Sequence, residues 1–339
     1  MTIKKHNIDS TEIGGYFGLD LPDYGELYTD VIKFQSGRAA MRAVLECNGI
    51  THVMMPAYIC GSIITAAVDA GIKVETYSLD EFLYPKSLPS VLPEKCVFIY
   101  VNYFGLCQKN ISRLIEEIPL DRLIIDNSQA LFSPHSNTLA TIYSPRKFVG
   151  LPDGGLLKAS PMLRIVPPEV EDRGSFDRMK FLLTRMAYSA REGFADSHKA
   201  RDSLGNTTPL AMSRLTQRLM KSIRWNQVIE LRRENYKTIA QMMDSINDLP
   251  LALGSADVPL CYPLTMKGWV NSKIKNKLAS HNVFAATYWP DASSRVKTNT
   301  IEAALVHETL FLPIDQRLQS DQIERVGNLA LQVTGKPAR

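Results

Sequence analysis

Lys147 is the residue whose surroundings point most directly to chemistry. It lies in the segment Ser144-Pro-Arg-Lys-Phe-Val-Gly-Leu-Pro-Asp-Gly-Gly155, a short polar loop that runs into two glycines. Upstream, the strand-like run Leu-Ile-Ile-Asp126 ends in an acid. A lysine can form a Schiff base with the aldehyde of pyridoxal phosphate, and a carboxylate can keep the pyridine nitrogen protonated so that the ring accepts electrons. The pair fits this cofactor, although a single loop lysine is usually a solvated charge.

A phosphate site is expected where Ser36-Gly37-Arg38 opens a helix-like stretch. The free N–H groups at the start of a helix attract anions, and Arg38 could add a direct charge. Ser144, close before Lys147, could offer a hydroxyl to the same phosphate. Each feature also has an ordinary explanation, because Ser-Gly is a common helix cap and Ser144 could be a plain loop serine.

Two further polar residues are expected at the same edge. Gln129 follows Asp126 closely and could reach the cofactor's phenolic oxygen, and Asn102 ends the preceding strand-like run. Asp126 could equally cap the turn that follows it, and Asn102 could be a structural amide. The sequence leaves these alternatives open.

The elements that must position these residues follow from the hydrophobic pattern. Between residues 30 and 160, apolar runs alternate with amphipathic helical stretches, which favours an α/β fold with a parallel sheet covered by helices. Strands are expected at His52–Pro56, Lys73–Tyr77, Cys96–Asn102, Arg122–Asp126 and Gly154–Ala159, and helices at Arg38–Asn48, Ser62–Ala70 and Ile111–Ile118.

The pattern changes after residue 160. A helix is expected at Phe176–Ala195, a polar linker at 196–209, a long helix at Leu210–Asp244, and then strands at Pro259–Leu264, Phe284–Tyr288 and Thr309–Leu312 with helices at Ser272–His281 and Ser320–Val333. This organisation predicts a large domain at residues 1–205 and a long helix with a small α/β domain at 206–339.

Composition excludes several classes of protein. The net charge of +4 is spread along the chain without a basic arm, which argues against nucleic-acid binding. No apolar run approaches the roughly 20 residues of a membrane span, and the N-terminus lacks an apolar signal core. The five cysteines form no CxxC pair, which predicts buried thiols without a metal site or disulfide framework. A cytoplasmic enzyme is expected.

Taken in order, the motifs resemble the DegT/DnrJ/StrS family of pyridoxal phosphate-dependent sugar aminotransferases, which have the aspartate aminotransferase (type I) fold. The resemblance covers about residues 34–158 and 258–330. It rests on the segments Ser36-Gly-Arg-Ala-Ala40, Met55-Pro-Ala-Tyr58, Val101-Asn-Tyr-Phe-Gly105, Ile125-Asp-Asn-Ser-Gln-Ala130, Pro145-Arg-Lys147, Asp153-Gly-Gly155, Phe284–Pro290 and Leu310-Phe-Leu-Pro-Ile314. These are similar to the family's phosphate turn, its Asp-Ala-Ala-Gln motif, its Pro-Thr-Lys loop and its C-terminal Leu-Ser-Leu-Pro-Ile segment.

The resemblance implies a large domain with a mainly parallel sheet, a smaller C-terminal α/β lobe, and a homodimer with active sites at the interface. It implies that Lys147 is the Schiff-base lysine, that Asp126 pairs with the pyridine nitrogen, and that Gln129 lies at the phenolic oxygen. The implied reaction moves an amino group from an amino acid, with L-glutamate the expected donor, to a keto sugar. The sugar is expected to be nucleotide-linked and to serve surface polysaccharide or a glycosylated metabolite.

This sequence departs from the family pattern near the cofactor and the substrate. The aromatic residue that stacks on the cofactor ring falls on Cys60, so either Cys60 or Tyr58 would pack there. The usual serine before the lysine is Ile142, which leaves Ser144 or Thr141 as substitutes. We expect Tyr58 and Tyr288 to contact the substrate.

Two alternatives follow from these departures. The chain could use pyridoxal phosphate on a non-sugar substrate or as a lyase, since a fold does not determine its chemistry. It could also be a non-catalytic partner protein that keeps the fold, although the intact Asp126 and Lys147 pair argues against this. Lys147 likewise argues against the family's sugar dehydratases, which have histidine at this position.

Overall fold

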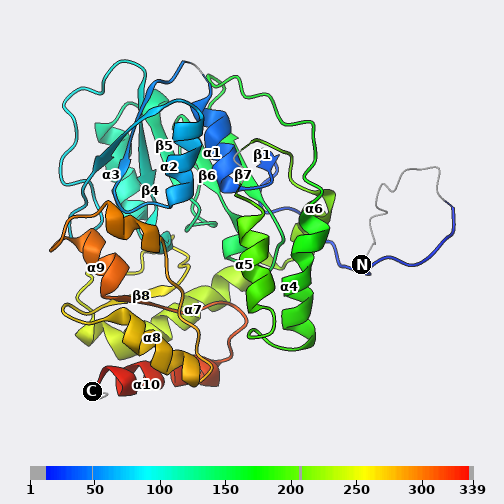
Figure 1. Cartoon of the computed structure of the whole chain (residues 1–339), viewed down its shortest axis with the longest axis vertical. Helices are drawn as coiled ribbons and strands as arrows, with labels where there is room; N and C mark the ends of the chain where they lie inside the picture. Colours follow the sequence, from blue (N-terminus) through cyan, green and yellow to red (C-terminus); the bar gives the residue numbers. More distant parts are fainter. Residues whose placement is uncertain (1–12, 48, 206–207, 336–339) are drawn as a thin grey trace.

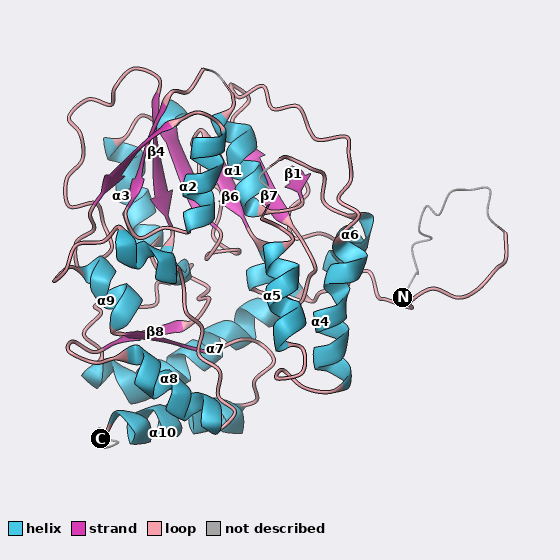
Figure 2. Ribbon diagram, viewed as in Figure 1, coloured by secondary structure: helices cyan, strands magenta, loops and turns pink. Residues whose placement is uncertain are grey.

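A seven-stranded sheet forms the centre of the larger part of the molecule (Figures 1 and 2). In the computed structural model, which describes residues 13–47, 49–205 and 208–335, the strand order is β1-β7-β6-β5-β4-β2-β3. The strands are β1 (Ile32–Phe34), β2 (His52–Pro56), β3 (Lys73–Tyr77), β4 (Cys96–Val101), β5 (Leu123–Asn127), β6 (Ala140–Tyr143) and β7 (Gly155–Ala159). Strands β3, β2, β4, β5 and β6 run parallel, β7 pairs antiparallel with β6, and β1 pairs antiparallel with β7. The expected mainly parallel sheet is confirmed.

The central strands are apolar throughout because both faces of the sheet are covered. Every residue of β4 and β5 is buried, as is typical of parallel strands between two helical layers. The helices of the described chain are α1 (Gly37–Leu45), α2 (Gly61–Asp69), α3 (Gln108–Glu117), α4 (Ser175–Ala187), α5 (Phe194–Asp202), α6 (Arg214–Lys221), α7 (Trp225–Met243), α8 (Asn271–Ser280), α9 (Ile301–His307) and α10 (Ser320–Thr334). None of the described helices is long and apolar enough to cross a bilayer.

The register of the sheet brings the predicted polar residues to one edge. Val101 of β4 pairs with Asp126 of β5, and Asp126 pairs in turn with Ile142 of β6. The carboxyl ends of these three parallel strands therefore meet, and the connections after them carry Asn102, Gln129 and Lys147. This edge is where ligands bind in open α/β sheets.

A smaller sheet lies in the C-terminal part of the chain (Figure 2). It consists of β8 (Tyr262–Thr265) and β9 (Thr309–Leu312), which pair antiparallel. The helices α7, α8 and α10 pack together beside it. This is the small α/β lobe that the resemblance implies, and the domain boundary at residue 205 stays a prediction.

Four sequence-based predictions between residues 176 and 288 are wrong. The helix expected at Phe176–Ala195 ends at Ala187. The expected linker at 196–209 contains α5, in which the ring of Phe194 packs on His198 at 4.4 Å; its residues 206 and 207 lie outside the described chain. The expected helix at Leu210–Asp244 is two helices, because Ser213 caps α6 through its hydroxyl and the chain turns at 222–224 before α7.

The expected strand at Phe284–Tyr288 is likewise absent from the described structure. It makes one isolated bridge, from Ala286 to Phe311, and the segment is held instead by aromatic packing of Tyr288. The helix expected at Arg38–Asn48 ends at Leu45, and Asn48 lies outside the described residues. The short strands β1 and β6 and the helix α9 were not predicted.

Candidate functional site

Small polar residues gather at the amino end of α1. Ser36 caps the helix, its hydroxyl accepting from the Ala39 N–H at 3.2 Å. A Cβ placed on Gly37 would lie 3.6 Å from Ser128 Oγ and 3.9 Å from Ser144 Cβ. Both serine side chains therefore face the first turn of the helix, whose N–H groups form an anion-binding site. Ser128 was not predicted, and its place between Asp126 and Gln129 was the available signal.

The β7 strand closes against this turn because Gly155 has no side chain. A Cβ at Gly155 would lie 2.2 Å from the carbonyl carbon of Ser36 and 2.5 Å from the nitrogen of Gly37. The second glycine after the lysine loop is therefore needed for the close approach of the two backbones, and the local structure at the start of α1 depends on it.

Asp126 and Lys147 face the same space. Asp126 is 2% exposed, and its Oδ1 accepts a hydrogen bond from the Ser128 N–H at 2.8 Å. Burial lowers the pKa of Lys147 below its ordinary value, Arg146 and Arg38 lower it further, and the Asp126 charge opposes them. A lowered pKa gives a lysine more of the neutral, nucleophilic form.

Two arginines add positive charge beside the lysine. Burial lowers the pKa of Arg146 to about 10, and the nearby charge of Arg38 contributes. The pKa of Arg38 is itself lowered by burial. Arg146 was not among the predicted site residues, although it stands next to Lys147. The two cations and the amino end of α1 favour a bound anion such as a phosphate.

Gln129 has one side-chain hydrogen bond in the protein and one amide group left for a ligand. Its Oε1 accepts from the Phe104 N–H at 3.0 Å, while its Nε2 is buried and has no partner among the described residues. A buried amide donor without a partner is costly, which favours a bound acceptor at this point. Asn102 differs, since its amide donates to Ser133 Oγ and accepts from the Cys107 N–H, both at 3.0 Å. It holds the turn after β4.

The three remaining predicted residues lie on the small-lobe side. Tyr58 has no exposed surface, its ring lies parallel to Tyr103 at 5.9 Å, and its hydroxyl donates to the Tyr288 carbonyl at 3.3 Å. The Tyr288 ring packs on Phe311 at 4.8 Å. Cys60 is half-buried, with its thiol 3.0 Å from Ser62 Oγ.

A cavity of about 760 Å³ opens beside Lys147 and is lined largely by cations and apolar side chains. Its charged lining residues are Arg146, Lys147, Arg185, Arg191, Arg232, Arg317 and Asp315. Asp315 is the one acid among the described lining residues, and Arg317 pairs with it at 2.6 Å. Tyr288 and Phe148 contribute to the apolar wall. The cavity suits a ligand with negative charge and an apolar or ring-shaped part.

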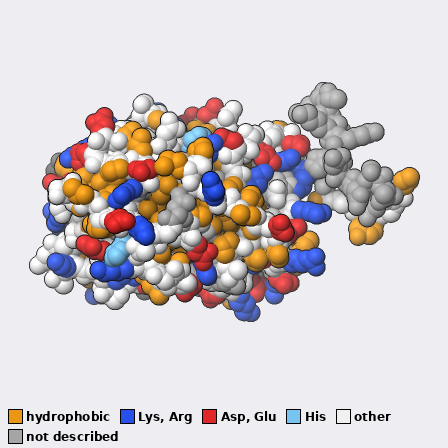
Figure 3. All heavy atoms as spheres, turned by 90° about the horizontal axis from the view of Figure 1, so that it is seen from above, with side chains coloured by type: hydrophobic (Ala, Val, Ile, Leu, Met, Phe, Trp, Pro, Cys, Tyr) orange, Lys and Arg blue, Asp and Glu red, His pale blue; other side chains and the backbone are white. Residues whose placement is uncertain are grey.

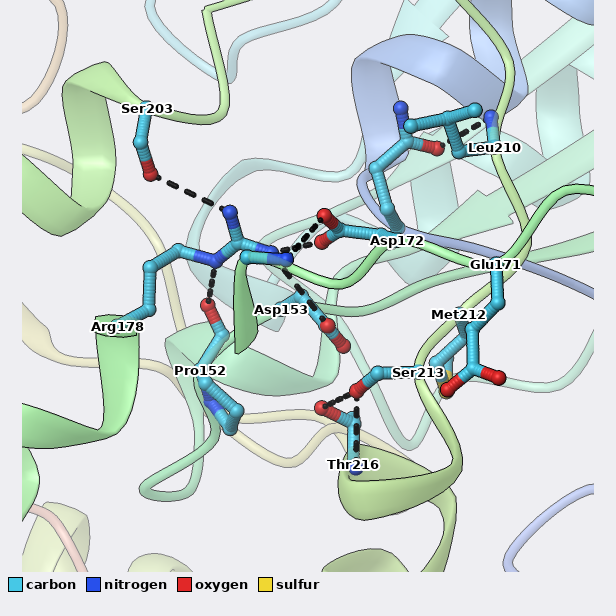
Figure 4. A network of polar contacts seen from close by, with 12 residues as sticks. Pro152, Asp153, Glu171, Asp172, Arg178, Ser203, Leu210, Met212, Ser213 and Thr216 are labelled. Atoms are coloured by element: carbon cyan, nitrogen blue, oxygen red, sulfur yellow. Dashed lines mark hydrogen bonds and ion pairs between the residues drawn. The ribbon is translucent and has the colours of Figure 1, made fainter. Parts of the chain in front are cut away.

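The loop after Lys147 is anchored from behind by a buried ion network (Figure 4). Arg178 on α4 donates to the Pro152 carbonyl at 3.1 Å, pairs with Asp172, and lies 3.7 Å from Asp153. Figure 4 shows Asp153 and Asp172 on the same side of the guanidinium, with Ser213 and Thr216 at the start of α6 close by. The network fixes the loop that carries the lysine against α4 and α6.

No protein-family model matches the chain, and neither does any curated protein sequence. Solved structures do share its fold. The aminotransferase TlmJ from Streptoalloteichus hindustanus is 16% identical, with a TM-score of 0.62 over 90% of this chain and 86% of that one. A DegT DnrJ EryC1 StrS aminotransferase from Brucella abortus is 14% identical, with a TM-score of 0.60 over 90% and 86%. NtdA from Bacillus subtilis, solved with its bound cofactor PMP, is 14% identical, with a TM-score of 0.63 over 92% and 74%.

These structures confirm the fold that the sequence motifs imply. The chain aligns over most of its length with aminotransferases of the suspected group, and the large mainly parallel sheet and the smaller lobe are common to them.

Proposed function

We propose that the chain is a pyridoxal phosphate-dependent aminotransferase that transfers an amino group from an amino acid to a keto sugar. The observation that carries this proposal is the interaction of the Lys147 and Asp126 charges at one sheet edge, with the unpartnered Nε2 of Gln129 following the same strand, in a fold shared with a sugar aminotransferase. The aminotransferases of similar fold include one solved with PMP, the amino form of this cofactor.

The chain offers a suitable partner for each polar group of the cofactor: its phosphate, its pyridine nitrogen and its phenolic oxygen. The first turn of α1, with Ser36, Ser128 and Ser144 around it, suits a phosphate. Asp126 suits a protonated pyridine nitrogen, and the free Nε2 of Gln129 suits the phenolic oxygen. When bound, the cofactor supplies an aldehyde carbon and an electron-accepting ring.

Lys147 is the proposed proton carrier. With the cofactor bound, the neutral Nζ amine of Lys147 would take the proton from the donor's α-carbon and would return it at the cofactor's aldehyde carbon. Burial lowers its pKa, which raises the fraction of the neutral base at a given pH. The Asp126 carboxylate would lie beside the ring nitrogen and would stabilise the negative charge that proton removal creates.

The cationic cavity supports an anionic substrate. Arg185, Arg191 and Arg317 line it together with Arg146. A nucleotide-linked keto sugar carries the required charge on its diphosphate, and L-glutamate carries carboxylates that the same cations can hold. Such a reaction would serve surface polysaccharide or a glycosylated metabolite, and we place the enzyme in the cytoplasm.

A homodimer is proposed because large apolar side chains stand exposed on the single chain. Ile13, Tyr16 and Phe17 on the projecting N-terminal segment are almost fully exposed, and Met186 and Tyr188 at the end of α4 are 80% and 74% exposed. Figure 3 shows apolar side chains on the projecting segment and across the face seen from above. Surfaces of this kind are typical of subunit contacts.

An absorbance titration tests the proposal. Wild type, Lys147→Ala and the surface control Lys86→Ala are mixed with pyridoxal phosphate and then with L-glutamate. We expect a visible band in wild type and in Lys86→Ala alone, and a shift to the pyridoxamine band after L-glutamate. The absence of any Lys147-dependent band would refute the proposal that the chain is an enzyme and would favour a non-catalytic partner protein. A band that no amino acid donor shifts would refute transamination and favour a lyase.

A further inference from the structure

We propose that Trp289 covers one face of the cofactor ring, in the position where Cys60 provides no aromatic side chain. The proposal rests on the proposed function, because it assigns a residue to the same cofactor. Trp289 was not among the predicted site residues, and it comes from the small lobe, far from Lys147 in sequence.

The indole is close to the lysine. Its centroid lies 5.9 Å from Lys147 Nζ, and Trp289 is 7% exposed. Aromatic pairs in proteins have centroids about 4.5–7 Å apart. A ring held on Nζ therefore comes within stacking or edge contact of the indole without a rearrangement of the lobe.

The segment that carries Trp289 is tied to the chain around Cys60. Arg295 donates to the Ile59 carbonyl at 2.7 Å and to the Ala57 carbonyl at 3.4 Å. Asp291 pairs with Arg295 at 2.7 Å, and its Oδ2 would be 2.3 Å from a Cβ on Gly61. The short helical turn Pro290–Ser294 thus lies directly against the start of α2. The segment that follows Trp289 therefore contacts residues on both sides of Cys60, and the indole itself contacts Tyr58.

The backbone of Trp289 is in an uncommon conformation that aims its side chain inward. Its φ of +49° and ψ of 56° lie in the left-handed region, which bulky residues rarely adopt. Its carbonyl accepts from the Ala292 N–H at 2.9 Å, which begins the following turn. Outliers of this kind persist where the surrounding structure holds them and are frequent at ligand sites.

The other aromatic rings nearby are already engaged. Tyr58 is fully buried between Tyr103 and the indole, with its hydroxyl bonded to the Tyr288 carbonyl. Tyr288 packs on Phe311 at 4.8 Å. Trp289 rests edge-on against Tyr58, with centroids 4.8 Å apart and a 61° interplanar angle. The Tyr58 ring therefore supports the indole, which is the ring that faces Lys147.

Cofactor binding provides the first test. Trp289→Ala should weaken the binding of pyridoxal phosphate about tenfold, since an aromatic contact and the covered ring face are lost. Trp289→Phe should restore most of the affinity. Trp269→Ala, in the small lobe, is the matched control and should bind as wild type does. The dissociation constant is measured from the absorbance band.

Tryptophan emission provides a second test that a purely structural effect would not reproduce. The chain has three tryptophans, and an indole in contact with the cofactor ring is quenched. Saturating cofactor should quench wild type and Trp269→Phe strongly, and should quench Trp289→Phe much less. Normal binding by Trp289→Ala, or equal quenching in the two Phe variants, would overturn this inference and leave the proposed function intact. A wild type that forms no cofactor band would overturn both.

Discussion

The guanidinium of Arg232 on α7 donates a hydrogen bond of 3.0 Å to the backbone carbonyl of Phe148, the residue directly after Lys147. The same side chain donates to the carbonyls of Pro259 and Leu260 at 3.2 and 3.1 Å. Arg232 is 2% exposed and its hydrogen-bond partners are neutral. It therefore joins the long helix, the lysine loop and the approach to the small sheet through backbone groups.

Replacing Arg232 with Met should destabilise the protein by about 3 kcal/mol, because several buried carbonyl groups lose their donor. Part of that cost is offset, since the variant no longer buries a cation whose pKa burial lowers to about 10. The midpoint of urea unfolding measures the effect. Lys237→Met, an exposed cation on the same helix, should change stability by less than about 0.5 kcal/mol. Equal midpoints for the two variants would contradict this account.

In the protein without cofactor, the buried Lys147 should lower the free energy of unfolding, and the size of this loss should depend on pH. Because burial lowers its pKa in the folded state, the folded protein binds its proton less readily than the unfolded chain. Lys147→Met should therefore be more stable than wild type near neutral pH. The difference should shrink as pH rises through the lowered pKa toward the ordinary lysine value of about 10.5.

Thermal or urea unfolding at several pH values between neutrality and pH 10 checks this prediction. Lys86→Met, in which an exposed lysine is replaced, should show no such trend. A Lys147→Met variant that is less stable than wild type at neutral pH would show that the buried amine stabilises the apoprotein.

The parts of the fold that the sequence predicts well are those where local pattern and tertiary environment agree. The bounds of β2 and β3 match the prediction, and β4 differs by one residue, because short runs with strand-forming residues that end at proline, glycine or polar residues have few alternatives. The predictions fail where tertiary contacts decide. The sequence around 222–224 carries no proline or glycine, yet the chain turns there between α6 and α7.

The residues of the candidate site also divide into those that the sequence predicts and those that only tertiary packing brings in. Asp126, Gln129 and Lys147 follow strands that share one sheet edge, so their meeting follows from the topology that the motifs imply. Trp289 and Arg232 are brought to that edge from the small lobe and from α7. No local pattern marks them, because their proximity to Lys147 depends on how the lobe packs.

The buried charge network behind the lysine loop permits a comparison with a surface ion pair on the same helix. Arg178 is 5% exposed and balances Asp172 and Asp153, whereas Lys180 is 70% exposed and lies 3.1 Å from Asp196. Removing one partner of a buried pair typically costs about 3–5 kcal/mol, and a surface pair is worth about 0–1 kcal/mol. Arg178→Met should therefore destabilise the protein far more than Lys180→Met.

The loss of stability caused by Arg178→Met should also become smaller at acidic pH. Burial raises the pKa of Asp153, and the Arg178 charge opposes that rise. Without Arg178 the folded-state pKa of Asp153 rises further above the unfolded value. The penalty is then complete above the raised pKa and falls as pH drops toward about 4, where both states bind the proton. Adding Asp153→Asn to Arg178→Met should recover part of the lost stability at neutral pH and remove the pH dependence. If the double variant were as unstable and as pH-dependent as Arg178→Met, the unpaired charge responsible for the loss of stability would be that of Asp172 and not that of Asp153.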